Sequence, residues 1–178
     1  MTRVLLVDDE VNVLQALKRL LARGLPEGAA RVEVASDPRE ALARAEYIRF
    51  DVVVSDYRMP SMDGVSFLKA MRALQPDGIR LILSASTDFD TIMTAVNEAE
   101  IHRYLTKPWS DEEVVTTVRE AIERHASLME DKLLADEKRV EAGHLDREEL
   151  ERRRLEAENP GITKAKWGPD GSLLIDDD

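Results

Sequence analysis

The sequence predicts an α/β fold in which helices cover both faces of a doubly wound, five-stranded parallel sheet. Three observations lead to this prediction. Short apolar segments alternate five times with segments of helical periodicity, which indicates parallel strands connected by helices. Hydrophobic residues make up 43% of the 178 residues but aromatic residues only 4%, which is typical of an aliphatic core. Right-handed crossovers and the count of five strands favour the strand order 2-1-3-4-5.

Each expected strand is a short apolar segment that leads into polar residues. The five segments are residues 3–7, 31–35, 51–55, 80–84 and 102–105. The first is a nearly continuous apolar run and the third is rich in β-branched residues, as expected of strands buried on both faces. The second alternates between apolar and polar residues, which indicates a strand at the edge of the sheet.

Helical spacing of apolar residues fills the intervals between the strands. It is found over Val11–Leu21, Pro38–Ala45 and Val65–Leu74, and again from Ile92 and from Ser110 onward. Residues that cap or end helices mark the boundaries: Gly24 with Pro26, Ser36 or Asp37 before Pro38, Asp88 before Ile92, and Ser110 with Glu113 as a capping box. A helix is therefore expected after every strand.

Composition and charge narrow the possible functions. The net charge is −11, and nucleic-acid binding depends on basic residues that neutralise phosphates. The run Arg152–Arg154 lies among glutamates, so we expect no nucleic-acid contact. The chain has no cysteine, which excludes disulfides and thiolate metal sites. No apolar stretch approaches the roughly 18 residues that span a bilayer, so a cytoplasmic protein without a membrane segment or signal peptide is expected.

Chemically reactive side chains gather where the expected strands end. In the order 2-1-3-4-5, strands one and three are neighbours at the point where strand order reverses, which is the usual ligand site of such sheets. Their carboxyl ends carry Asp8, Asp9 and Asp56, while Ser84 and Lys107 follow strands four and five. A single acid at a strand end is usually an ordinary loop residue. The five together predict a Mg²⁺-dependent phosphoryl site in which an aspartate is the nucleophile.

Four segments resemble the receiver domain of two-component response regulators, a bacterial signalling module with the flavodoxin-like fold of the chemotaxis regulators. The matching stretches are residues 5–10, 53–64, 83–85 and 104–109, within residues 1–123. The resemblance implies that Asp56 accepts a phosphoryl group from a histidine kinase or phosphotransfer protein. It also implies that Asp9, Asp56 and the Arg58 carbonyl bind Mg²⁺ directly, that Asp8 acts largely through a water, and that Mn²⁺ substitutes for Mg²⁺.

The same resemblance assigns roles to residues around Asp56. Ser84 and Tyr104 would form a switch: the hydroxyl turns toward the new phosphoryl acceptor, and the aromatic ring enters the vacated space. Arg58 and Ser86 would influence how long the phosphoryl group persists. Lys107–Pro108 resembles the cis peptide of the family. For Ser84 and Tyr104 taken singly, ordinary structural roles at a strand end and in the core remain the alternative.

Residues 124–178 are expected to form an extension that is not a DNA-binding domain. Helical composition continues to about Ala142, and Gly143 interrupts it. A second helix is then expected to begin at Leu145–Asp146 and to end at Asn159–Gly161. Short apolar segments on both sides of residues 168–171 predict a β-hairpin. We expect this extension to dimerise or to bind a partner; the alternative is a frayed tail.

Three functions remain open from the sequence. The chain can be a phosphorylation-dependent response regulator that signals through protein–protein interaction. It can be a phosphorelay shuttle or phosphate sink without a dedicated output, or a scaffold in which phosphorylation is vestigial. The intact set of reactive residues argues against the scaffold, and the extension favours the first function. The only catalysis expected is self-phosphotransfer and autodephosphorylation, so no enzyme activity on another substrate is predicted.

Overall fold

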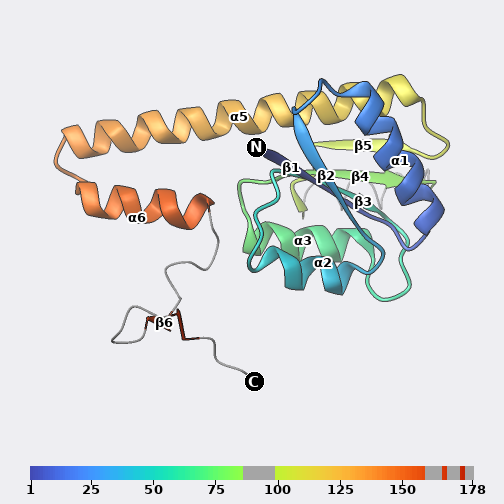
Figure 1. Ribbon diagram of the computed structural model, residues 1–178, viewed down its shortest axis with the longest axis horizontal. Helices are drawn as coiled ribbons and strands as arrows, with labels where there is room; N and C mark the ends of the chain where they lie inside the picture. The colour runs from blue at the N-terminus through green and yellow to red at the C-terminus, as the bar shows by residue number, and fades with distance from the viewer. Residues whose placement is uncertain (86–98, 159–165, 168–172, 175–178) are drawn as a thin grey trace.

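The computed structural model describes residues 1–85 and 99–158 and two short strands at 166–167 and 173–174. Its centre is a five-stranded parallel sheet with the order β2-β1-β3-β4-β5 (Figure 1). The strands are β1 (Thr2–Val7), β2 (Ala30–Ala35), β3 (Val52–Asp56), β4 (Ile79–Ser84) and β5 (Arg103–Thr106). Their positions differ from the expected ones by one residue at most, and the predicted doubly wound fold is confirmed.

Helices pack on both faces of this sheet. The described helices are α1 (Val11–Gly24), α2 (Pro38–Ala45), α3 (Gly64–Leu74), α5 (Asp111–Glu141) and α6 (Arg147–Glu158). Figure 1 shows α2 and α3 on one face and α1 and α5 on the other. The helix expected after Asp88, around Ile92, lies outside the described residues.

Alternation along the strands builds two separate core layers. Leu5 of β1 packs with Phe67 of α3 in one layer, whereas its neighbour Leu6 packs with Leu14 of α1 and Val118 of α5 in the other. Successive residues of a strand point to opposite faces, so β1 serves both layers. These side chains are at most 2% exposed, which explains the continuous apolar run in the sequence.

Local capping fixes where the helices begin. The Asp37 carboxylate accepts a hydrogen bond from the Arg39 backbone N–H, so Asp37, and not Ser36, caps α2. The Ser110 hydroxyl likewise accepts from the Glu113 N–H at the start of α5. Both contacts satisfy a backbone donor that has no partner within its helix. The helices after β2 and β5 therefore begin at capping residues that the sequence indicated.

The extension is a helical hairpin. Helix α5 has 31 residues and runs for about 46 Å, past the end of the sheet. Gly143 has a φ of +72° at the turn, and the Asp146 carboxylate caps α6 at the Glu149 N–H. Figure 1 shows α6 returning beside the outer half of α5. Among the described residues, no helix is both long enough and apolar enough to cross a lipid bilayer.

The end of the chain contains the predicted hairpin. Strand β6 (Lys166–Trp167) pairs antiparallel with β7 (Leu173–Leu174). Their register places Lys166 opposite Leu174 and Trp167 opposite Leu173. The turn expected at residues 168–171 lies outside the described residues. The helical extension and the terminal hairpin are thus both present.

Arg49 joins the extension to the rest of the chain. It lies between α2 and β3, and its Nη1 donates to the Ala157 carbonyl near the end of α6, at 2.6 Å. Its Nη2 donates to the Met129 sulfur at 2.9 Å and lies 3.1 Å from Nε2 of His125 in α5. Since carbonyl groups at a helix C-terminus lack partners within the helix, a guanidinium there stabilises the helix end. The helical hairpin of α5 and α6 is thus held against the segment between α2 and β3.

The buried His125 beside Arg49 predicts a pH-dependent loss of stability. Burial lowers the pKa of His125 below its usual 6.5; Asp51 opposes this shift, and Arg49 adds to it. Because the unfolded chain protonates this histidine at a higher pH than the folded chain, the unfolded state binds more protons below about pH 6.5. The contribution of neutral His125 to the stability of the folded chain is therefore complete above pH 6.5. It decreases as the pH falls toward the lowered pKa.

We expect the urea midpoint of the wild-type protein to fall between pH 7.5 and 5.5 by more than that of His125→Gln. The glutamine retains polar atoms for Arg49 but has no charge to gain. The difference between the two proteins removes the contribution of other titrating groups. Equal pH dependence in both proteins would show that His125 does not carry this effect.

Candidate functional site

A lysine joins two carboxylates at the carboxyl edge of the sheet. The Lys107 ammonium, just after β5, lies 2.6 Å from Oδ1 of Asp56 and 2.7 Å from Oδ2 of Asp8. Asp56 is the last residue of β3 and Asp8 follows β1. Asp8 and Asp56 are 1% and 7% exposed, so both charges are buried. The structure thus brings together three residues that the sequence placed on three different strand ends.

Backbone groups fix the remaining carboxylate oxygens. Oδ2 of Asp56 accepts a hydrogen bond from the Arg58 N–H at 2.7 Å, and Oδ1 of Asp8 accepts from the Glu10 N–H at 2.9 Å. Each carboxylate therefore binds one backbone donor and the lysine. Such an arrangement holds the charged groups in place before any ligand arrives, which is the main requirement of phosphoryl-transfer sites.

Charge within this cluster is not balanced. Burial raises the pKa of Asp8 above its usual value, and the nearby Asp56 carboxylate adds to this, although the bonds from Lys107 and the Glu10 N–H oppose it. Burial lowers the pKa of Lys107, but the hydrogen bonds to Asp56 and Asp8 outweigh it and raise the pKa overall. Two carboxylates share one ammonium, so a bound cation would reduce the repulsion between them.

The donor set at this edge of the sheet fits Mg²⁺. Mg²⁺ commonly uses one or two carboxylates and keeps several waters, and Asp8, Asp9 and Asp56 supply carboxylate oxygens of this kind. Asp9 lies between β1 and α1 and is exposed, so its carboxylate is open to solvent. Over residues 1–85 and 99–158, no three histidine or acidic side chains are close enough to form a metal cage by themselves. The Arg58 carbonyl and solvent would therefore complete the coordination.

Gly64 contributes to this site and was not among the predicted residues. A Cβ atom on Gly64 would lie 2.1 Å from the Asp56 backbone carbonyl oxygen, and the Gly64 N–H donates to the Tyr57 carbonyl at 2.8 Å. The Asp63 carboxylate caps α3 directly before it, by accepting from the Ser66 N–H. The loop after β3 can close over Asp56 because this position has no side chain. In the sequence, a glycine directly after the residue that caps α3 was the signal that could have identified this position.

The residues expected to form the switch lie on neighbouring strands. Ser84 ends β4 and is 2% exposed, and its carbonyl accepts from the Lys107 N–H at 2.8 Å. Tyr104 is half-buried in β5 and packs against the layer between the sheet and α2 and α3. The Lys107–Pro108 peptide is cis. Of the two residues assigned to phosphate lifetime, Arg58 is exposed and Ser86 lies outside the described residues.

Fold and site together define a class of protein. The class is that of doubly wound α/β domains that have buried carboxylates and a lysine at the switch point of a 2-1-3-4-5 sheet. The family model of the response regulator receiver domain matches residues 4–119. The chain belongs to the response regulator receiver domain family.

Similar proteins extend this assignment. The chain is 36% identical over 142 residues to the hydrogenase transcriptional regulatory protein HoxA of Bradyrhizobium diazoefficiens, covering 80% of this chain and 28% of HoxA. It is 30% identical over 159 residues to the cyclic di-GMP phosphodiesterase response regulator RpfG of Xanthomonas campestris, covering 84% of this chain and 41% of RpfG. The chain thus spans well under two thirds of these relatives.

Solved structures show the same fold. The signal receiver domain of an HD domain-containing protein from Pseudomonas fluorescens is 36% identical, with a TM-score of 0.65. The match covers 71% of this chain and 98% of that receiver domain. A CheY-like receiver domain protein from Methanospirillum hungatei, at 24% identity, shares the fold with the same TM-score. Homology to the receiver domains of response regulators supports a place for this chain in two-component signalling.

Proposed function

We propose that the chain is a phosphorylation-dependent response regulator. Asp56 accepts a phosphoryl group from a histidine kinase or phosphotransfer protein, and Mg²⁺, or Mn²⁺ in its place, is required. The observation that carries this proposal is the Lys107 ammonium, which lies within 2.7 Å of both Asp56 and Asp8. A buried carboxylate with an adjacent cation has the composition of a phosphoryl-acceptor site.

In the proposed reaction an Asp56 oxygen attacks the phosphorus of a phosphohistidine. The new O–P bond forms as the P–N bond breaks, and the electron pair returns to the imidazole ring. Lys107 neutralises charge on the transferring oxygens, while the Arg58 N–H holds the carboxylate in position. Mg²⁺ held by Asp9, Asp56 and the Arg58 carbonyl, with Asp8 acting largely through a water, would neutralise further phosphoryl charge when bound.

Phosphorylation would then bias a two-state switch. The Ser84 hydroxyl turns toward a phosphoryl oxygen, and Tyr104 moves into the space it leaves. Reversing a 1:99 population requires roughly 5.5 kcal/mol, but one charge-assisted hydrogen bond contributes only about 1.5–3 kcal/mol. The shift is therefore partial by itself, and a binding partner completes it. Arg58 and Ser86 tune how long the phosphoryl group persists.

The extension is the proposed output surface. Residues 1–123 act as the receiver, and residues 124–178 bind a second copy or another protein; no nucleic-acid contact is involved. The net charge of −11 and the pairing of Arg152–Arg154 with glutamates in α5 and α6 support this division. The helical hairpin held by Arg49 favours a dedicated output over a phosphate shuttle or sink. We place the protein in the cytoplasm, with no activity beyond its own phosphorylation and dephosphorylation.

Acetyl phosphate provides a direct test of the acceptor site. We expect one acid-labile phosphoryl group per chain by intact-mass spectrometry in the presence of Mg²⁺, and none after chelation with EDTA. Mn²⁺ should restore labelling. Equal labelling without a divalent cation, or a label that resists hydroxylamine, would contradict a cation-dependent acyl phosphate.

A further inference from the structure

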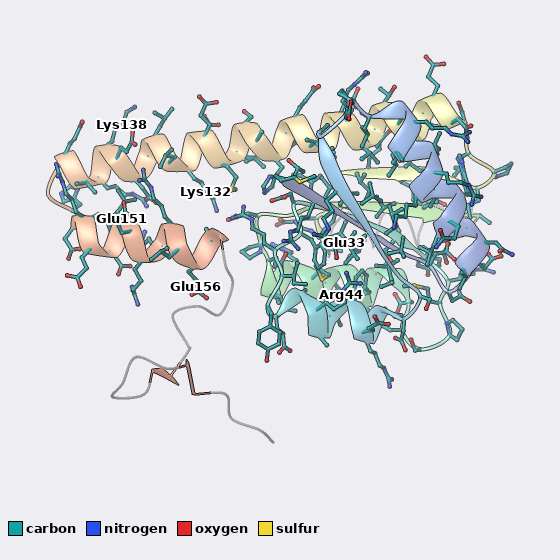
Figure 2. The ribbon with its side chains drawn as sticks, in the orientation of Figure 1. Glu33, Arg44, Lys132, Lys138, Glu151 and Glu156 are labelled. Atoms are coloured by element: carbon teal, nitrogen blue, oxygen red, sulfur yellow. The ribbon has the colours of Figure 1, made fainter. Side chains whose placement is uncertain are left out.

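A groove between α5 and α6 is lined by apolar and basic side chains. Its volume is about 800 Å³, and its floor includes Met129, Leu133 and Leu150. Five basic side chains line it but only two acidic ones, in a chain whose net charge is −11. Figure 2 shows Lys132 projecting from the side of α5 that faces α6, whereas Lys138 projects from the opposite side. The groove therefore combines an apolar floor with a basic rim.

Two of the basic side chains are accessible to a ligand. The Lys132 side chain is 58% exposed and that of Arg139 is 60% exposed. Each pairs with one aspartate of its own chain, Asp77 and Asp136 respectively, but such exposed pairs are weak and leave the cations open to further acids. On the floor, Leu133 is 38% exposed. An apolar segment followed by acidic residues would complement this surface.

The end of this chain has that sequence. Residues 173–178 read Leu-Leu-Ile-Asp-Asp-Asp. Strands β6 and β7 pair with each other, and Figure 1 shows β6 lying away from α5, α6 and the sheet. Because an isolated two-stranded hairpin is marginally stable in water, this part of the chain needs a surface to pack on. Within one copy, the described strands and the groove are apart.

We propose that the groove binds residues 173–178 of a second copy. Leu173 and Leu174 would cover the apolar floor, and Asp176–Asp178 would pair with Lys132, Arg139 and their basic neighbours. The same contact made in both directions gives a closed dimer with twofold symmetry. This inference rests on the proposed role of the extension as an interaction surface, and it names the partner segment.

Charge reversal tests the exchange without removing any part of the chain. The groove variant carries Lys132→Glu and Arg139→Glu, and the tail variant carries Asp176→Lys, Asp177→Lys and Asp178→Lys. Each variant alone sets like charges against each other, so the Kd of its dimer should rise at least about tenfold relative to the wild type. Light scattering after size exclusion, over a series of loading concentrations, measures the mass.

An equimolar mixture of the two variants should recover the dimer. The acidic tail of the groove variant meets the basic groove of the tail variant, and the reversed pair is also attractive. A control variant carries Lys18→Glu and Arg19→Glu on an exposed face of α1. It makes the same change in charge away from the groove, so it should form a dimer as stable as that of the wild type. Circular dichroism checks that α5 and α6 remain folded. If the charge reversals unfold these helices, a neutral groove variant with Lys132→Gln and Arg139→Gln takes their place. Its dimer should be weaker than that of the wild type.

Three results would overturn the proposal. A monomeric wild type, or a dimer that both variants retain, excludes this interface. Two monomeric variants that fail to recover on mixing show that the acidic tail and the basic groove do not pair between copies. Labelling by acetyl phosphate on the same samples keeps the proposals separate, because loss of the dimer leaves the Asp56 label intact, and loss of the label leaves the dimer intact.

Discussion

Asp56→Asn is expected to abolish incorporation of the acid-labile phosphoryl group. An amide oxygen is a poor nucleophile, and the bond that an acyl phosphate requires cannot form. Burial is the main cause of the raised pKa of Asp8, and the neutral amide removes the additional repulsion from Asp56, so the variant should remain folded. Lys107 then neutralises Asp8 one to one. We therefore expect a thermal midpoint at least as high as that of the wild type, together with a complete loss of label from acetyl phosphate or a phosphorylated histidine kinase.

Asp37→Asn is a matched control for this change. Asp37 is also an aspartate after a strand of the sheet, but its carboxylate caps α2, and asparagine caps helices equally well. This variant should keep full labelling and near-normal stability. Undiminished labelling of Asp56→Asn would place the acceptor elsewhere, and loss of labelling in both variants would point to a general effect of the substitutions on the fold.

Gly64→Ala should have the largest effect on stability. The new methyl group would meet the Asp56 backbone carbonyl at 2.1 Å, so the loop or the end of β3 must move. Overpacking of this kind costs about 3 kcal/mol or more where backbone is the obstacle. For a chain of this size the melting temperature should fall by roughly 6–12 °C. Because Asp56 itself is displaced, the rate of labelling should fall as well.

Gly28→Ala separates packing from backbone conformation. Gly28 has a φ of +74°, and a Cβ there would meet nothing within 4 Å. An alanine in this conformation costs about 1 kcal/mol through strain alone. It should lower the melting temperature slightly and leave labelling unchanged. If Gly64→Ala were as mild as Gly28→Ala, the close approach between Gly64 and Asp56 would not constrain the site.

The site and the extension occupy opposite edges of the sheet. Asp8, Asp56 and Lys107 lie after the strands, whereas Arg49 and Asp51 lie just before β3. Asp51 accepts the Arg3 N–H at 2.7 Å, and Arg49 binds the end of α6. Helix α5 packs along one face of the sheet with Val118 and Ala121 buried, and then carries His125 to the Arg49 contact. A movement of α5 would therefore reach both edges.

The sequence by itself determined the elements and their order. Strand positions follow from aliphatic runs and helix starts from caps such as Asp37 and Ser110, because both signals come from neighbouring residues. The 2-1-3-4-5 order follows from handed connections, and it predicts that the ends of β1 and β3 lie side by side. For that reason the amino-acid sequence alone is enough to group Asp8 with Asp56, and it places Lys107 at the same edge of the sheet, two strands from β3.

Only the tertiary structure decided how those residues meet. It gave Lys107 contacts to both carboxylates, left Asp9 exposed, and placed Gly64 against the Asp56 carbonyl. It also joined Arg49 to Ala157, 108 residues apart in the chain. Such contacts depend on side-chain length, loop closure and the angle between packed helices. No local pattern encodes these quantities, since they result from how all the elements pack together.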